Sequence, residues 1–470
     1  MKRYLLFTIL ALLLWPIFSL AQIRESLPTQ QKSWLDKANR HEKNGWIYLR
    51  IEGAPRERGF QHGYLLADEI KEAIRVLRTK WEYQSGMDWS WLVGKAGVIL
   101  SPHVDQENLA EIDGMVEGMK AKGVETSRDE LVALNGYMEL VWYWWPLVKD
   151  SVRSNTPAPK KEGCSSFIAT GSMTSDGKIV LGHNSMVSYE DPFCNIILDI
   201  VPSEGHRVLM QAFVGFIHSG TDFFVTDAGL VGSETTIGSF YPFDPKGVPE
   251  FARMRHATQY ASSIDEWCDI MKKDNSGGYA NAWLLGDINT NEIARLELGL
   301  KFVGFERKKD GFFVGSNVPE EVKILRFETK LEETNIKYSS VARRARWKEL
   351  MKKYTGKINL DLAEAFESEH YDEYLKNDTP TCRTLCAHYE LDSQSNGLGT
   401  PYEPGGTIDG KVLDAQTASR MAFVARWGSA CGKAFDAKKF LQEHLQFDWM
   451  QTILKDRPSQ PWTEFKAGEQ

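Results

Sequence analysis

A cysteine that directly follows a glycine is the residue in this sequence best suited to covalent chemistry. Residues 162–166 read Glu-Gly-Cys-Ser-Ser, and residues 151–162 carry two prolines and two lysines, the composition of an exposed loop. If the bond between Gly163 and Cys164 is cut, the thiol gains its own α-amine as a neighbouring base, with a reference pKa of about 7.7–8.0. Nucleophile and base would then be one residue. The alternative is that Cys164 is a buried strand cysteine or half of a disulfide.

The same cysteine could make this cut itself. Attack of its thiol on the carbonyl carbon of Gly163 would give a thioester that water hydrolyses, and glycine leaves that carbonyl without steric cover. The sequence therefore predicts a cleavage site between Gly163 and Cys164, with residues 164–470 as the catalytic chain.

The elements that must position this cysteine change in type at residue 164. Residues 22–163 are expected to be mainly helical after one strand-like stretch, Trp46 to Ile51, and residues 107–120 have the spacing of an amphipathic helix. From residue 164, short strands alternate with turn residues. The expected hairpins pair residues 164–170 with 178–183, 195–201 with 207–214, 222–226 with 230–235, 282–286 with 293–298, and 301–306 with 312–314.

Helices are expected to cover this β region. One helical block is predicted at residues 250–273, where Ser263 and Glu266 have capping-box spacing, and the chain after Ser339 reads as helices with long polar loops. The predicted class is α+β, with an antiparallel β core and helices against it.

Composition excludes several classes of function. The chain has 470 residues, of which 42% are hydrophobic, so it is globular. Its net charge of −8 without a basic block argues against nucleic-acid binding. No phosphate loop, dinucleotide fingerprint, C-x-x-C, H-E-x-x-H or zinc-type His/Cys spacing is present, so no cofactor and no metal is predicted. Most of the 15 tryptophans should be core, although the clusters at residues 89–91 and 142–145 would also suit the wall of an acyl-chain pocket.

The N-terminus has the layout of an export signal. Residues 1–21 combine a basic start, an apolar run from Tyr4 to Leu14 and small residues before a predicted cut after Ala21. An uncleaved anchor is the alternative, but the apolar run is short for a bilayer, and no later stretch is apolar for about 18 residues. We therefore expect a periplasmic or secreted chain with no transmembrane segment. The six cysteines leave one or two disulfides open.

A series of sequence blocks after Cys164 resembles a known family. The blocks are residues 164–166, 182–186 with Tyr189, 220–224, 229–231, 234–238, 276–283, 385–387 and 406–412, and residues 59–63 match upstream. In this order they resemble the phospholipase B-like family of N-terminal-nucleophile hydrolases, and more distantly the penicillin-acyltransferase type of autoproteolytic acyltransferases. Met186 stands where the family has Trp, and His388 where it has Arg. Arg383, five residues upstream of His388, is the candidate to substitute.

The resemblance implies a fold, a processing event and roles for individual residues. It implies a four-layer αββα sandwich and self-cleavage into two chains that stay associated, residues 22–163 and 164–470. Carried over by position, Cys164 is the nucleophile and His183 the active-site histidine. Asn281 is a candidate oxyanion donor, since an amide NH₂ aimed at the tetrahedral oxygen can contribute about 3 kcal/mol. The remaining candidates, for substrate binding, are Glu234, Thr235 and Arg383. Taken alone, such strand residues are more often structural.

Three functional hypotheses follow. The leading one is an exported, self-processed hydrolase of acyl ester or amide bonds, with lipid-like substrates such as phospholipids or fatty-acid N-acyl amides. The second keeps the nucleophile but takes polar amides, such as peptides, β-lactams or cell-wall fragments, with hydrolysis or acyl transfer. The third is a non-catalytic exported binding protein in which Cys164 is structural. Homo-oligomer formation is left open by the sequence.

Overall fold

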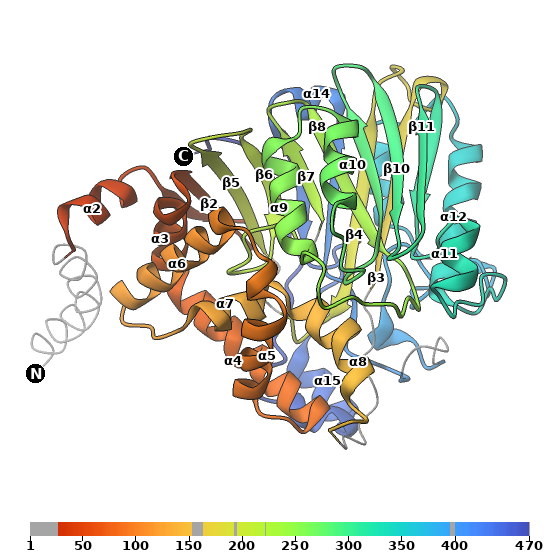
Figure 1. Cartoon of the computed structure of the whole chain (residues 1–470). Helices are drawn as coiled ribbons and strands as arrows, with labels where there is room; N and C mark the ends of the chain where they lie inside the picture. Colours follow the sequence, from red (N-terminus) through yellow and green to blue (C-terminus); the bar gives the residue numbers. More distant parts are fainter. Residues whose placement is uncertain (1–26, 153–162, 192–194, 221, 395–399, 470) are drawn as a thin grey trace, which may run out of the picture.

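Two large β-sheets packed face to face form the centre of the computed structural model (Figure 1), which describes residues 27–152, 163–191, 195–220, 222–394 and 400–469. Sheet A has the strand order β1 (Asn39–Lys43), β2 (Trp46–Gly53), β5 (Ile196–Pro202), β6 (Val208–Ala212), β7 (Phe223–Thr226), β8 (Leu230–Thr236), β9 (Asn281–Asp287), β10 (Glu292–Leu298) and β11 (Val303–Lys308). Sheet B has the order β12 (Gly311–Gly315), β3 (Gly163–Thr170), β4 (Val180–Ser188), β16 (Asp409–Asp414), β17 (Ala422–Trp427) and β18 (Thr463–Lys466), with β15 (Gly405–Thr407) beside β4.

Helices cover the outer face of each sheet. Helices α9 (Glu250–Tyr260) and α10 (Ile264–Lys272) pack on β7, β9 and β10 of sheet A, and Figure 1 shows them lying over that sheet. Helices α12 (Ser339–Lys353) and α13 (Leu360–Glu367) pack on β12, β4 and β16 of sheet B, while β3 and β4 contact β8 between the sheets. This arrangement confirms the predicted αββα sandwich.

The segment before Cys164 is mainly helical, as predicted, but it also completes sheet A. Its helices are α2 (Thr29–Leu35), α3 (Pro55–Leu65), α4 (Ala67–Ser85), α5 (Trp89–Ile99), α6 (Gln106–Ala121), α7 (Arg128–Asn135), the π-helical turn η2 (Glu139–Trp144) and α8 (Trp145–Val148). Two strands, β1 and β2, lie between α2 and α3, where one was expected. β1 and β2 form a hairpin through Asn44 and Gly45, whose φ angles of 49° and 80° suit a tight primed turn. β2 then runs parallel to β5.

Helices α3 and α6 approach so closely that glycine is required where they cross. A Cβ atom on Gly59 would lie 1.8 Å from the carbonyl oxygen of Glu111, and one on Gly118 would lie 2.3 Å from that of Phe60. Backbone therefore packs directly on backbone, and the Gly59–Gly63 block noted in the sequence belongs to this contact.

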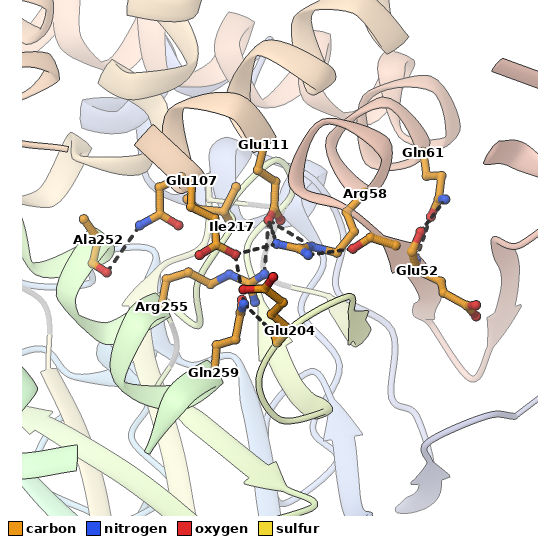
Figure 2. A network of polar contacts seen from close by, with 12 residues as sticks. Glu52, Arg58, Gln61, Glu107, Glu111, Glu204, Ile217, Ala252, Arg255 and Gln259 are labelled. Atoms are coloured by element: carbon orange, nitrogen blue, oxygen red, sulfur yellow. Dashed lines mark hydrogen bonds and ion pairs between the residues drawn. The ribbon is translucent and has the colours of Figure 1, made fainter. Parts of the chain in front are cut away.

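A buried ion-pair network joins the same helices to α9 (Figure 2). Arg58 of α3 and Arg255 of α9 both donate to Oε2 of Glu111 on α6, at 2.8 and 3.1 Å. Glu107, one turn earlier on α6, accepts from Gln259 of α9 at 2.9 Å. Polar bonds of this kind tie the segment before Cys164 to the segment after it.

Four of the five predicted hairpins are confirmed, namely β3–β4, β5–β6, β7–β8 and β9–β10. The fifth, between residues 301–306 and 312–314, is wrong. β11 stays in sheet A beside β10, whereas β12 crosses to sheet B and pairs with β3. Asp310 explains the crossing, since its Oδ1 accepts hydrogen bonds from the backbone N and the Oγ of Ser172 after β3.

The remaining elements lie mostly in the C-terminal part of the chain. They are the helices α11 (Val322–Phe327), α14 (Ala415–Ser419) and α15 (Ala437–Glu443), the short strands β13 (Tyr371–Asp372) and β14 (Asn377–Asp378), and the 3₁₀ turns η1 (Ser101–His103), η3 (Gly171–Met173), η4 (Tyr389–Leu391) and η5 (Leu445–Met450).

Two expectations concern the cysteines and the membrane. All five cysteines in the described ranges are free thiols, and Cys194 lies outside those ranges. The predicted signal, residues 1–21, also lies outside them. Among the helices of the described part of the chain, none combines the length and the apolar character needed to cross a bilayer.

Candidate active site

Cys164 lies at the start of β3, at the edge of a narrow pocket between the sandwich and the N-terminal helices. It is buried, with 6% of its surface exposed, and it faces Ser185 across the β3–β4 ladder. The pocket is narrow and partly open to solvent, and it is lined by Met138, Trp142, Gly163, Cys164, Ser185, Val187, Phe213, Gly220, Thr236 and Tyr279. Most of these side chains are apolar, so the pocket suits an acyl group more than a charged one.

Arg343 holds the backbone of Cys164, and the side chain of Asn317 lies beside Gly163. Nη1 of Arg343 donates to the carbonyl oxygen of Cys164 at 2.6 Å, and Nη2 donates to Oδ1 of Asn317 at 2.7 Å. A Cβ atom on Gly163 would lie 2.8 Å from that same Oδ1, which explains the glycine. Nδ2 of Asn317 in turn donates to the carbonyl oxygen of Thr236 at 2.7 Å, so this brace links sheet B to the end of β8.

A buried tyrosine connects the pocket to two carboxyl groups. The hydroxyl of Tyr279, which lines the pocket, lies 2.7 Å from Oδ2 of Asp222 and 2.7 Å from Oε1 of Glu234. Burial raises the pKa of Glu234 to about 7. Burial and the Glu234 carboxyl raise the pKa of Asp222 well above its usual range. The two carboxyl groups therefore share a proton near neutral pH.

The surroundings of Cys164 hold it as a neutral thiol. Burial is the main cause of a pKa well above the ordinary thiol value, and Glu234 and Asp222 raise it further, while Lys411 opposes them. Lys411 is itself paired with Asp409 at 2.7 Å and donates to Oγ of Ser185 at 2.7 Å. A reaction at this thiol consequently needs a base that removes its proton as the sulfur attacks.

His183 lies between the sheets beneath this cysteine. It faces Ser166 in the β3–β4 ladder, two residues along each strand from the Cys164–Ser185 pair. Its Nε2 lies 2.9 Å from the carbonyl oxygen of Glu234, and burial together with Lys411 holds its pKa well below the usual value. The imidazole is therefore neutral and donates through Nε2. The structure gives it a positioning contact to the backbone of β8.

Thr235 lies near the end of β8 and Asn281 begins β9, each next to a residue that lines the pocket. Asn281 pairs with Thr236, and it follows Tyr279 by two residues. Only 1% of Asn281 is exposed, yet both its amide nitrogen and its amide oxygen lack hydrogen-bond partners among the described residues, as does Oγ1 of Thr235. Buried amides are normally paired, so an unpaired one next to a pocket is available to a ligand.

Arg383 lies apart from the pocket lining. Its Nε donates to Oδ2 of Asp372 at 2.8 Å, and its Nη1 is 3.4 Å from Oδ2 of Asp392. The guanidinium that contacts the nucleophile's backbone belongs instead to Arg343. A role for Arg383 in substrate binding stays a prediction, and the charge contacts that the structure gives it are with Asp372 and Asp392.

The tryptophan clusters divide between core and pocket. Trp81, Trp91 and Trp145 pack on one another among the N-terminal helices. Trp142, by contrast, lines the pocket, and its ring centroid lies 6.2 Å from that of Tyr279. The segment before Cys164 therefore supplies part of the pocket wall.

Several residues of this site carry no role in the sequence analysis. Asp222 and Tyr279 lie inside blocks that resemble the family. Their φ angles of 56° and 49° are positive, a strained backbone conformation that is held by the surrounding tertiary structure. Arg343 is 179 residues from Cys164 and lies on α12. Nothing in its local sequence distinguishes it from the other arginines of that helix.

Comparison with known proteins gives a family match in the centre of the chain. The family model described as Phospholipase B matches residues 105–299. Human phospholipase B-like 1 is 26% identical over 237 residues, which cover 46% of this chain and 41% of that protein. Human putative phospholipase B-like 2 is 38% identical over 89 residues, 18% of this chain and 15% of that protein. The matches thus span less than half the length of these relatives.

Solved structures give weaker similarity. A mutant of conjugated bile acid hydrolase from Clostridium perfringens aligns with 56% of this chain and 89% of its own, at 10% identity and a TM-score of 0.32. Penicillin V acylase from Agrobacterium tumefaciens aligns with 56% of this chain and 83% of its own, at 13% identity and a TM-score of 0.31. The sequence matches show that the central part of this chain is similar to the phospholipase B-like proteins.

Proposed function

We propose that this chain is an exported, self-processing N-terminal-nucleophile hydrolase that cleaves acyl ester or amide bonds with an apolar acyl group. One observation carries the proposal: Cys164 directly follows a glycine, begins a central strand and borders a mostly apolar pocket. The resemblance to phospholipase B-like proteins supports ester or amide bonds as the target. The apolar lining favours lipid-like acyl chains over polar amides.

Self-processing would begin with attack of Sγ of Cys164 on the carbonyl carbon of Gly163. The C–N bond breaks as the C–S bond forms, and the thiol proton passes to the departing nitrogen, which becomes the α-amine of Cys164. Water then hydrolyses the thioester, which leaves a carboxylate on Gly163 and restores the thiol. Arg343 supports this step because it holds the carbonyl oxygen of Cys164 and orients Asn317 beside Gly163.

Turnover would use the same sulfur with the freed amine as base. The amine takes the thiol proton as sulfur attacks the substrate carbonyl, and it returns the proton to the leaving alcohol or amine. A thioester remains, and a water molecule activated by the amine hydrolyses it. The unpaired amide of Asn281 is the side chain best suited to stabilise the tetrahedral oxygen. The raised pKa of Cys164 supports a mechanism with a dedicated base.

The two chains would remain associated after the cut. Strands β1 and β2 are part of sheet A, and the buried network of Arg58, Glu111 and Arg255 crosses between the segments (Figure 2). Trp142 and Met138 come from the first chain and line the pocket. The first chain would thus be needed for the fold and for substrate binding.

The test compares the intact masses and N-terminal sequences of the parent protein with those of Cys164→Ala and Cys268→Ala. Cys268 is a buried cysteine on α10 and serves as the matched control. We expect a new N-terminus at Cys164 in the parent and in Cys268→Ala, a single chain in Cys164→Ala, and release of fatty acid from phospholipids or N-acyl amides by the processed proteins only. An uncut parent that resists maturation by mild acid or limited proteolysis would favour the binding-protein hypothesis.

A further inference from the structure

Two cysteines and two histidines from separate parts of the chain meet beside sheet B, where His388 bridges Gly406 of β15. They are His370, Cys386, His388 and Cys431, and one potential ligand atom from each lies within 4.8 Å of all the others. Cys386 and His388 are buried, and the other two are partly buried. We propose that these four side chains form a structural zinc site with tetrahedral Cys₂His₂ coordination.

The distances between the ligand atoms fit a tetrahedral ion. Nε2 of His388 lies 3.6 Å from Sγ of Cys386 and 3.4 Å from Sγ of Cys431. With Zn–S bonds of about 2.3 Å and Zn–N bonds of about 2.0–2.1 Å, tetrahedral angles require S···N separations of roughly 3.5 Å. The two S···N separations in the structure therefore match those expected around a tetrahedral zinc ion. The four ligands come from three separate loops.

The surroundings of these ligands have the features of a metal site. Nδ1 of His388 lies 2.8 Å from Oε1 of Glu390, so a carboxylate orients the ring and leaves Nε2 free for a metal. Glu390 is itself held by the hydroxyl of Tyr189 at 3.2 Å. The backbone nitrogen of Cys431 donates to Sγ of Cys386 at 3.4 Å, a bond that stabilises a thiolate.

His370 completes the set. Its ring centroid lies 5.1 Å from that of His388, and its buried Nε2 has no hydrogen-bond partner among the residues that the structure describes. Thiolate and imidazole together select zinc over the hard cations magnesium and calcium, which prefer oxygen. No metal site is predictable from local sequence spacing here, because Cys386 and Cys431 are 45 residues apart.

The site would fasten the C-terminal loops to the sandwich. The backbone nitrogen of Cys386 donates to the carbonyl oxygen of Glu369, and Nδ2 of Asn184 on β4 donates to the carbonyl oxygen of Leu385 at 2.9 Å. Asn184 is the residue before Ser185, which faces Cys164. A metal bound here would hold the outer face of the strand that pairs with the nucleophile, without contact to the substrate.

The experiment measures metal content and cobalt spectra of the full-length protein, neither of which depends on catalysis. Protein purified without chelators should contain about one zinc per chain by elemental analysis. Exchange of zinc for cobalt should give the thiolate charge-transfer and visible bands of a tetrahedral site. Cys386→Ser and Cys431→Ser should lose both signals, whereas Cys268→Ser should keep both.

A further variant separates binding from folding. Glu390→Gln keeps all four ligands and should weaken zinc binding roughly 10–100-fold, as expected for a group that orients a ligand. Parent protein that folds by circular dichroism yet takes up no zinc or cobalt after reduction would overturn the proposal. So would a Cys386–Cys431 disulfide found by peptide mapping in metal-free, active protein.

Discussion

At the scale of single residues, the shared proton of Asp222 and Glu234 is the feature with the clearest consequence. Both carboxyl groups are fully buried and contact the hydroxyl of Tyr279. Because burial raises both pKa values, the folded chain binds a proton more tightly than the unfolded chain does. Stability and pH are therefore coupled at the pocket itself.

We expect this coupling to make the protein more stable in mild acid. The pKa of Glu234 is about 7 when folded, against an ordinary value of 4.5, so the free energy of unfolding should fall as pH rises from about 4.5 to about 7. The Tm measured by scanning calorimetry should be higher at pH 5 than at pH 7.5, and Glu234→Gln should flatten this dependence. Glu117→Gln, a change at the surface, should leave it unaltered, and equal slopes in all three proteins would contradict the assignment.

The unpaired amide of Asn281 gives a second prediction at this scale. If it stabilises the tetrahedral oxygen, Asn281→Ala should lower kcat about 10²–10³-fold with a much smaller change in KM. Steady-state kinetics on an acyl substrate measures both constants. Asn289→Ala, in the turn after β9, is the matched control and should retain full activity. A variant that loses only substrate affinity would point to binding instead.

Some residues of the candidate site could be predicted from sequence and others could not. Cys164 could be identified from the sequence because a glycine, a polar loop and a change of periodicity coincide at one position. Asn281 and Glu234 entered through sequence blocks that resemble a family. The role of Arg343 could not be predicted from the sequence. Its contact with Cys164 is created by the packing of α12 on sheet B and leaves no local sequence pattern.

At the scale of elements, the close crossing of α3 and α6 depends on glycine residues, which have no side chain at the contact. A methyl group on Gly118 would lie 2.3 Å from the carbonyl oxygen of Phe60. Gly118→Ala should therefore destabilise the protein by about 1–3 kcal/mol or more. Gly94→Ala on α5 is the matched control, because nothing lies within 4 Å of the added carbon, and it should stabilise by about 0.5–1 kcal/mol. Urea unfolding of both variants checks the difference in sign.

The ion-pair network between α3, α6 and α9 makes a related prediction. Burial alone would raise the pKa of Glu111, but Arg255 and Arg58 outweigh it and lower that pKa. Glu111→Gln would leave two buried guanidinium groups without their carboxylate, which should cost about 3–5 kcal/mol. Glu117 on the same helix pairs with Arg56 at the surface, so Glu117→Gln should cost less than about 1 kcal/mol in the same unfolding assay.

Most elements of the fold follow from sequence periodicity, and the exceptions have physical causes. Four hairpins were predictable because turn residues separate strands that pair with their neighbours. The strand β1 was missed although Asn44 and Gly45 are a strong hairpin signal, since residues 39–43 are polar and little buried. The crossing of β12 to sheet B was not predictable, because a distant loop residue, Ser172, fixes it.

At the scale of the whole molecule, the two sheets bring together residues from every part of the chain. The pocket takes Trp142 from the segment before the nucleophile, Cys164 and Ser185 from sheet B, and Tyr279 from the region that enters β9. Sequence patterns indicated the layers of the sandwich. They did not indicate which side chains of the two sheets face each other, because the packing of one sheet on the other sets that alignment. The Cys₂His₂ cluster was not predictable because its ligands come from loops that are far apart in the sequence.

The pairing of β2 with β5 affects how the protein can refold before and after cleavage. Before the proposed cut, these strands belong to one chain and refolding is a first-order process, but afterwards two polypeptides must meet in solution. Recovery of the processed protein after dilution from denaturant should therefore fall as its concentration falls, while recovery of Cys164→Ala should not change. After the bond is hydrolysed, the native state could form again only when the two chains associate. The processed protein would therefore persist because it unfolds slowly, and not because it refolds repeatedly.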